Sequence, residues 1–185
     1  MGKTFKVYIF LFVITGLIYP FVITGLSQLF FKEKAKGSII YKDGKLVGSE
    51  LLAQPFVSRG LFLSRPSAVD YNPLSSGGSN LAPTNPELYR QVSQRVKLFN
   101  ERPVPSYLVF TSASGLDPHL PPSAVYFQIK RVSKETGLPE EEIKKLIEKH
   151  TEDRTFGIMG QEKVNILKLN MDILKLLESG GHGRP

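Results

Sequence analysis

The sequence predicts an α+β fold, in which a single N-terminal transmembrane helix precedes one mixed α/β soluble domain in a chain of 185 residues. Three observations support this prediction: an uncharged apolar run near the N-terminus, helical periodicity in four later segments, and short β-branched runs between them. We divide the chain into a short N-terminal segment (1–6), a transmembrane helix (7–31), a basic collar (32–37), the α+β domain (38–178) and a flexible tail (179–185).

The first predicted element is a membrane anchor. Residues 7–31 carry no charge, and at about 1.5 Å per residue they can cross a hydrocarbon layer of about 30 Å. A cleavable signal peptide is the alternative, because lysines precede the run, but the run is longer than an h-region of roughly 7 to 15 residues and no A-x-A-like site follows. Gly16, Pro20 and Thr24 lie four residues apart, which predicts a stripe for helix packing; the plainer interpretation is that Gly and Pro are common in such helices.

A hairpin and a long loop open the soluble domain. Extended runs at 38–41 and 45–47 flank the turn signal Lys42-Asp43-Gly44, which predicts a β-hairpin. From Gln54 to Pro86 regular periodicity disappears, and Pro, Gly, Ser and Asn dominate. Because this loop also holds several large apolar side chains, we expect it to wrap in an ordered way over the domain.

The rest of the domain reads as alternating helices and strands. Thr84 or Asn85 as N-cap and Pro86 in the first turn predict a helix over 86–100. A β-branched and aromatic run at 107–111 predicts a buried strand. We then expect a helix that ends at Gly137, a helix from Pro139, a strand over 164–169 and a final helix capped by Asn170.

Few residues offer chemistry of their own. The segment SSGGSN lacks the lysine and the adjacent helix start of a phosphate-binding P-loop. Ser112, Ser114, Asp117 and His119 supply the residue types of a hydrolytic triad, so a membrane-anchored hydrolase using Ser114, Asp117 and His119 is an alternative function. No G-x-S-x-G elbow surrounds either serine, and Asp117-Pro118 also suits a turn in which the carboxylate accepts backbone N–H groups.

Residue spacing and net charge argue against metal-binding, disulfide-bonded and nucleic-acid-binding classes of protein. The histidines lack metal-ligand spacing, so we expect no metal, and the absence of cysteine rules out disulfides. The net charge is +7, but acidic residues share the basic helix faces and no RNP-like motif occurs; we expect contact with lipid headgroups or an acidic partner, and no nucleic acid. Lysines flank both ends of the apolar run, so the positive-inside rule leans only slightly towards a cytoplasmic domain, which keeps a cytosolic nucleotide-sensing module as a third alternative.

Several motifs together carry a family resemblance. In order along the chain they are SRPSAVDYN, SGGSNLAPTNPEL, SGLDPH, an S-A-x-x-[YF]-Q segment from Ser123 to Gln128, and VNILKLN. With these motifs behind one membrane helix, residues 1–177 resemble the C subunit of the Kdp-type potassium-transporting ATPase. Ala82 stands where that family usually has glycine, and Ser64 where an aromatic residue is common before Arg65-Pro66.

The resemblance implies a noncatalytic accessory subunit of a high-affinity, ATP-driven potassium uptake complex in a prokaryotic plasma membrane, with its main domain outside the cytoplasm. Its implied partners are a potassium-channel-like subunit, a P-type ATPase subunit, a small membrane subunit and membrane lipid. The absence of D-K-T-G and of a filter loop agrees with a noncatalytic role. The family role is that of a catalytic chaperone that raises the ATP affinity of the ATPase subunit, with Gln128 implicated, and ATP is an expected cofactor by resemblance only. ATP lies on the opposite side of the bilayer from such a domain, so support of assembly and of the potassium entrance is physically easier.

The density of Gly and Pro in two loops leads to an interface hypothesis. We expect loop 65–86 and turn 114–119, here called the platform, to form a stiff surface against the potassium subunit, while the membrane helix docks through its Gly16 face. We expect no catalytic residue. The candidate interface residues are Gly16, Pro20, Thr24, Arg65, Pro66, Ser76, Gly77, Gly78, Ser79, Asn80, Pro83, Thr84, Asn85, Asp117 and His119.

Overall fold

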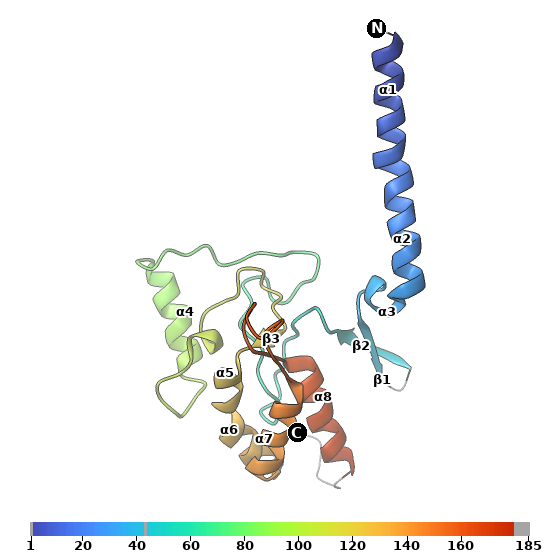
Figure 1. Cartoon of the computed structure of the whole chain (residues 1–185). Helices are drawn as coiled ribbons and strands as arrows, with labels where there is room; N and C mark the ends of the chain where they lie inside the picture. Colours follow the sequence, from blue (N-terminus) through green and yellow to red (C-terminus); the bar gives the residue numbers. More distant parts are fainter. Residues whose placement is uncertain (1, 43, 180–185) are drawn as a thin grey trace. The chain divides into compact units, whose positions relative to one another are not determined.

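The computed structural model describes residues 2–42 and 44–179, and the chain divides into two compact units, one that ends at Ser49 and one that begins at Glu50. The first unit begins with a long apolar helix (Figure 1). Helix α1 (Gly2–Val13) continues through a π-helical segment, η1 (Ile14–Ile18), into α2 (Tyr19–Phe30). These 29 residues are long and apolar enough to cross a membrane. The helix therefore starts before the predicted residue 7 and ends near the predicted residue 31.

Pro20 accounts for the π-helical segment. Proline has no N–H to offer the carbonyl of Gly16, and its ring would collide with that carbonyl in an α-helix. The N–H of Tyr19 instead donates to the carbonyl of Ile14, five residues earlier. The regular α-helical spacing expected for Gly16, Pro20 and Thr24 is thus interrupted between the first two.

The predicted hairpin is confirmed. After the short helix α3 (Lys32–Ala35), strands β1 (Ile39–Lys42) and β2 (Lys45–Ser49) pair antiparallel, with a bulge next to Ile40. Gly44 in the turn has a φ of +72°, as its place in the turn signal predicts. The turn residue Asp43 and residues 180–185 of the predicted tail lie outside the described residues.

The second unit is built from helices and one small sheet, which confirms the α+β class. Its sheet has three short antiparallel strands in the order β3 (His119–Leu120), β5 (Lys163–Asn165) and β4 (Thr151–Glu152). Helices α5 (Pro122–Tyr126), α7 (Glu140–His150) and α8 (Ile166–Ser179) pack on β5, and α7 also packs on α5, α6 (Ile129–Thr136) and α8 (Figure 1). Its elements are α4 (Pro86–Val96), the 3-10 turn η2 (Ser106–Leu108), β3 (His119–Leu120), α5 (Pro122–Tyr126), α6 (Ile129–Thr136), α7 (Glu140–His150), β4 (Thr151–Glu152), β5 (Lys163–Asn165) and α8 (Ile166–Ser179).

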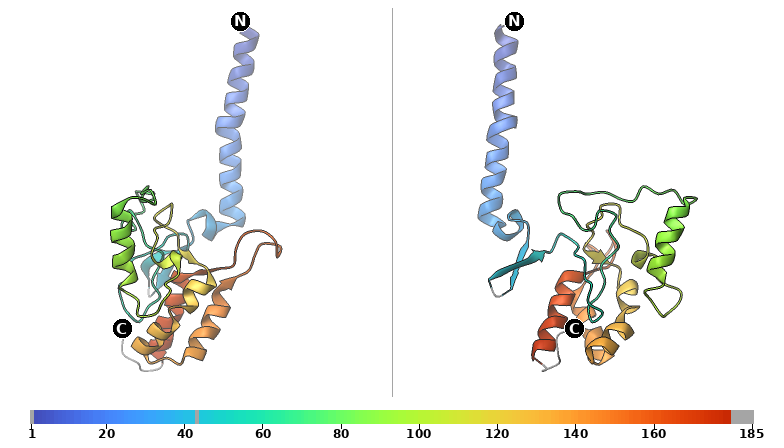
Figure 2. Two further views of the ribbon diagram at one scale, coloured as in Figure 1. Left: turned by 90° about the vertical axis from the view of Figure 1, so that its left-hand side faces the viewer. Right: turned by 180° about the vertical axis from the view of Figure 1, so that it is seen from behind.

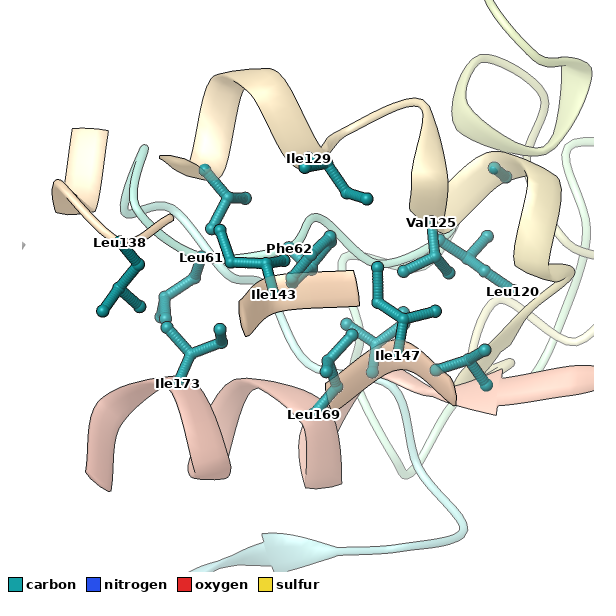
Figure 3. Close-up of a cluster of buried hydrophobic side chains, with 14 of the residues drawn as sticks. Leu61, Phe62, Leu120, Val125, Ile129, Leu138, Ile143, Ile147, Leu169 and Ile173 are labelled. Carbon is teal, nitrogen blue, oxygen red and sulfur yellow. The ribbon is translucent and has the colours of Figure 1, made fainter. Parts of the chain in front are cut away.

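The core lies between α5, α6, α7 and α8. Val125, Ile143 and Ile173 are among its fully buried side chains, and they converge from three of these helices (Figure 3). Leu61 and Phe62 enter the same cluster from the long loop. The loop is therefore part of the core, and the predicted ordered wrap is confirmed. Burial of one such side chain contributes about 1.5–3 kcal/mol.

The structure differs from four predictions made from the sequence: one strand, the extent of two helices, and the last strand with its helix cap. The strand over 107–111 is wrong: the N–H of Leu108 donates to the carbonyl of Pro105, and the run forms η2 and an irregular segment in which Leu108 and Val109 are buried but Phe110 is exposed. A short apolar run marks burial but has no period that separates a strand from a buried turn. The helix over 86–100 ends at Val96, and the helix before Gly137 is broken into α5 and α6.

The fourth correction concerns the last strand and its cap. Strand β5 ends at Asn165, whose side chain accepts the N–H of Lys168 at 3.2 Å, as an N-cap does. Helix α8 therefore starts at Ile166, and Asn170 is a buried residue inside it. Residues 163–170 hold two asparagines, and strand pairing rather than capping propensity decides which of them starts the helix.

Candidate functional site

The two segments of the predicted platform contact each other directly. The N–H of Gly77 donates to the carbonyl of Ser114 at 2.8 Å, and the hydroxyl of Ser76 donates to the same carbonyl at 3.1 Å. Just before the turn, the N–H of Ser112 donates to the carbonyl of Pro66 at 3.1 Å. Segments some forty residues apart are thus closed into one surface by backbone bonds at both ends.

Gly115 sits at the tightest point of this contact. Its φ is +71°, and a Cβ there would lie 2.6 Å from Val69 Cγ2 and 2.8 Å from the carbonyl oxygen of Gly77. Only glycine fits both the backbone conformation and the space. Gly77 and Gly78 are less constrained, because a Cβ on either would meet its nearest atom at 3.8 Å and 3.3 Å respectively. Sequence reasoning emphasised the glycine pair and left Gly115 out, although its place after Ser114 in SGLDPH was a signal.

Arg65 ties the base of the platform together. Its guanidinium bonds Asp117 Oδ2 and the carbonyl of Thr111, both at 3.3 Å, and lies 5.0 Å from the centre of the Tyr107 ring. Asp117 Oδ1 also accepts the N–H of His119 at 3.1 Å, which confirms the predicted turn. The structure thus brings together Arg65, Asp117 and His119, which lie in two separate sequence motifs.

Side chains inside loop 65–86 hold its irregular backbone. The hydroxyl of Ser67 accepts the N–H groups of Val69 and Tyr71, both at 3.0 Å, and the Tyr71 hydroxyl donates to the carbonyl of Arg65 at 3.1 Å. Burial raises the pKa of Tyr71, so the phenol stays a neutral donor. These bonds take the place of a regular backbone ladder.

The outer surface of the platform is made of short polar residues and proline. Ser76, Asn80, Pro83 and Thr84 are exposed, while Gly77, Gly78, Ser79 and Pro66 are half-buried. Of the two candidate caps, Asn85 starts α4, because its side chain accepts the N–H of Glu87 at 2.9 Å. Thr84 therefore does not cap the helix, and its exposed side chain can contact a partner.

The residues of the hydrolase alternative are near each other but are bonded elsewhere. The hydroxyl of Ser114 accepts the N–H of Leu116, and Asp117 faces Arg65. The Nδ1 of His119 lies 3.9 Å from Asp117 Oδ1, beyond hydrogen-bond range. Burial, with help from Lys163, lowers the pKa of His119. In the part of the chain that the structure describes, no hydrogen bond joins Ser114 to His119, so a triad would require rearrangement of the Arg65 pair.

Gln128 lies in the core and clamps the long loop. Its side chain is 1% exposed; Oε1 accepts the N–H of Leu63 at 2.9 Å, and Nε2 donates to the carbonyl of Leu63 at 3.4 Å. Asn170 does the same for the neighbouring Phe62, at 2.8 and 2.9 Å. We call Gln128 and Asn170 the amide clamp. Arg131 adds bonds to Gln128 Oε1 and to the carbonyls of Arg59 and Leu61.

The sequence predicted a helix cap at Asn170 and did not predict its role in the amide clamp. A buried amide on an otherwise apolar helix face is the signal that could have identified Asn170. A hollow of about 210 Å³ beside Gln128 is lined by Lys130, Arg131 and Lys134, but also by Glu101 and Glu135. Lys130 pairs with Glu101 at 3.2 Å, so the lining carries charges of both signs. Among residues 2–42 and 44–179, no cluster of three metal-ligating side chains occurs.

Comparison with known proteins gives a consistent result. The family model described as K+-transporting ATPase, c chain (KdpC) matches residues 1–175. A potassium-transporting ATPase KdpC subunit from Caldanaerobacter subterraneus subsp. tengcongensis is 46% identical over 180 residues, or 94% of this chain and 93% of its own. The KdpC subunit of Koribacter versatilis is 46% identical over 167 residues, with 87% and 86% coverage. That of Photorhabdus laumondii is 49% identical over 179 residues, with 92% and 93% coverage.

Proposed function

The chain belongs to the KdpC family, the c chain of K+-transporting ATPases, and on that premise we propose that it is a noncatalytic accessory subunit that assembles and stabilises its complex. Membership makes it a membrane-associated subunit of a potassium-transporting ATPase. In the proposal, a potassium-channel-like subunit carries the ion and a P-type ATPase subunit hydrolyses ATP. This chain supplies a surface on which they assemble.

The observation that carries the proposal is the closure of two loops into one preformed platform. Gly77 bonds Ser114, Gly115 packs against Val69, and Arg65 spans the base. A surface that is already ordered loses little conformational entropy on binding, so more of its contact energy appears as affinity. Its exposed face offers backbone groups and short polar side chains, which suit a protein surface.

We place the domain outside the cytoplasm, with the platform against the outer surface of the potassium-channel-like subunit. The membrane helix would dock through the side that carries Gly16, Pro20 and Thr24, with lipid and a small membrane subunit as its other neighbours. The resemblance adds the role of catalytic chaperone for the ATPase subunit. The amide of Gln128 is fully engaged in the core, so we assign its effect on ATP to the position of Leu63 rather than to direct contact.

The test places a bulky charge on the platform without disturbing its internal bonds. Pro83→Arg and Thr84→Arg change exposed residues, and Ser123→Arg on α5 is the matched control. We expect the two platform variants to reduce the yield of copurified complex at least tenfold and to weaken potassium uptake at low concentration, whereas the control does neither. Normal assembly and potassium affinity in both platform variants would refute the role of the platform.

The side of the membrane has its own test. The chain contains no cysteine, so Glu148→Cys on α7 creates a single labelling site at an exposed position. An impermeant maleimide should label it in intact cells, to the extent reached after lysis. Labelling only after lysis would place the domain in the cytoplasm and overturn this part of the proposal.

A further inference from the structure

The turn between β4 and β5 exposes three large apolar side chains. Phe156 is 86% exposed, Ile158 79% and Met159 53%, and together we call them the apolar tip. Every residue from Asp153 to Glu162 is exposed. Figure 2 shows the segment between α7 and α8 projecting from the helices of its unit. Adjacent apolar groups of this size in water are typical of a contact surface.

The tip is rigidly built. Thr155 and Met159 exchange both backbone hydrogen bonds, at 2.8 and 3.0 Å, and the N–H of Gly157 donates to the carbonyl of Arg154 at 2.9 Å. The N–H of Ile158 also donates to the carbonyl of Thr155, closing a tight turn around Phe156 and Gly157. The backbone that carries the three side chains is therefore ordered by its own hydrogen bonds, which lowers the cost of ordering the turn on binding.

The backbone of Phe156 is strained. Its φ is +54° and that of Gly157 is +74°, so the pair forms the centre of a left-handed turn. Such turns favour Asn or Asp before glycine, and a bulky aromatic residue in this conformation is an outlier. The folded chain alone gains no burial from the exposed ring in return. Strain of this kind at an exposed position indicates a function for the side chain.

The charges beside the tip restrict its partner. Glu152, Asp153 and Glu162 flank it, against Arg154 and Lys163, and Lys163 pairs with Glu152 at 3.3 Å. These five residues carry a net charge of −1, with Asp153 and Glu162 left beside the tip, in a chain whose net charge is +7. Apolar anchors that enter lipid carry basic flanks, which an anionic membrane surface attracts. An acidic rim fits a protein pocket with basic edges.

We propose that the apolar tip is a second docking point, separate from the platform, which inserts into an apolar pocket with a basic rim on another subunit of the transport complex. The proposal rests on the assignment of this chain as an accessory subunit. Phe156 is the central anchor, because it is the most exposed member of the tip. Ile158 and Met159 surround it and exclude water from the contact.

The first experiment removes the ring and relieves the strain together. Phe156→Asn suits the left-handed conformation, so the free full-length chain should unfold at the same or a higher denaturant concentration. Its affinity for the complex that lacks this subunit, measured in lipid nanodiscs, should fall at least about 30-fold, as for an aromatic hot spot. Val57→Asn is the matched control, because Val57 is 90% exposed on another loop, and it should leave the affinity unchanged.

Equal effects of the two substitutions, or no effect of Phe156→Asn, would overturn the proposal. This outcome is distinct from failure of the platform, which the substitutions at Pro83 and Thr84 test separately. Asp153→Lys examines the rim: weaker binding supports a basic pocket edge, whereas unchanged or tighter binding contradicts it.

The second experiment identifies what covers the tip. A benzophenone amino acid replaces Phe156 in the full-length chain, and cells that make the whole complex are irradiated. A cross-link to another subunit supports the proposal. A cross-link to lipid, a cross-link to a second copy of this chain, or the absence of any cross-link would overturn it.

Discussion

Gly115→Ala tests the closure of the platform at its tightest point. The new Cβ would lie 2.6 Å from Val69 Cγ2 and 2.8 Å from the carbonyl oxygen of Gly77, at a φ of +71°. A left-handed backbone costs a residue with a Cβ about 1–2 kcal/mol. Overpacking adds about 1–3 kcal/mol, because Gly77 is held by its bond to Ser114 and cannot withdraw freely. We expect a loss of about 2–5 kcal/mol in the free energy of unfolding.

The chain offers a control that separates the two costs. Gly157 has a φ of +74°, but a Cβ there would meet nothing within 4 Å. Gly157→Ala should therefore cost only the backbone term, about 1–2 kcal/mol. Urea unfolding of the full-length chain in detergent, followed by circular dichroism, gives both values by linear extrapolation.

The reasoning fails if the two substitutions destabilise the chain equally, because the contact with Val69 and Gly77 would then contribute nothing. Copurification adds a second readout. Gly115→Ala should lower the yield of assembled complex at temperatures where the variant is still folded. An unfolded variant would be recognised by its lost circular dichroism signal.

Three further predictions concern other bonds. Asn170→Leu leaves the buried N–H and carbonyl of Phe62 unpaired, so the free energy of unfolding should fall by about 2–5 kcal/mol in urea titrations; a loss below about 1 kcal/mol would contradict the clamp. Asp172→Asn should cost about 1 kcal/mol at pH 7. Hydrogen bonds from Lys149 and other neighbouring cations hold the pKa of Asp172 well below its ordinary value, so its stabilisation is complete above about pH 4 and is lost progressively as the pH falls towards the lowered pKa; the difference between wild type and variant should narrow in part from pH 7 to pH 3. Arg65→Lys keeps the charge but loses the fork that joins Asp117 and the backbone, so limited proteolysis within 65–86 should become faster, and an unchanged rate would refute the role of the fork.

Local signals explain which elements the sequence could predict. Asn85 and Pro86 start α4, and Gly137, with a φ of +75°, ends α6, because each acts through its own backbone conformation or hydrogen bonds. The apolar run at 107–111 has no such signal, and its environment decides its conformation. The same holds for the start of α8, which depends on how far β5 pairs with β3 and β4.

The sequence predicted which segments form the platform, but it did not predict the hydrogen bonds and contacts that join them. Family motifs placed Arg65 and Asp117 in one candidate surface, yet their contact joins residues 52 positions apart. Gly115 stands beside Ser114 in a quoted motif, but the sequence does not reveal that Val69 occupies the space a side chain would need. Contacts between irregular loops follow no period, so no pattern in the sequence encodes them.

The amide clamp links the core to the platform. Loop 50–86 has no strand ladder, so its backbone groups need other partners wherever they are buried. Gln128 and Asn170 satisfy those of Leu63 and Phe62 from the core, which fixes the loop two residues before Arg65. A substitution at Gln128 would therefore displace Arg65 and the surface it holds, although Gln128 itself is buried. We expect such a substitution to act on the complex through the platform, from a residue that no partner contacts.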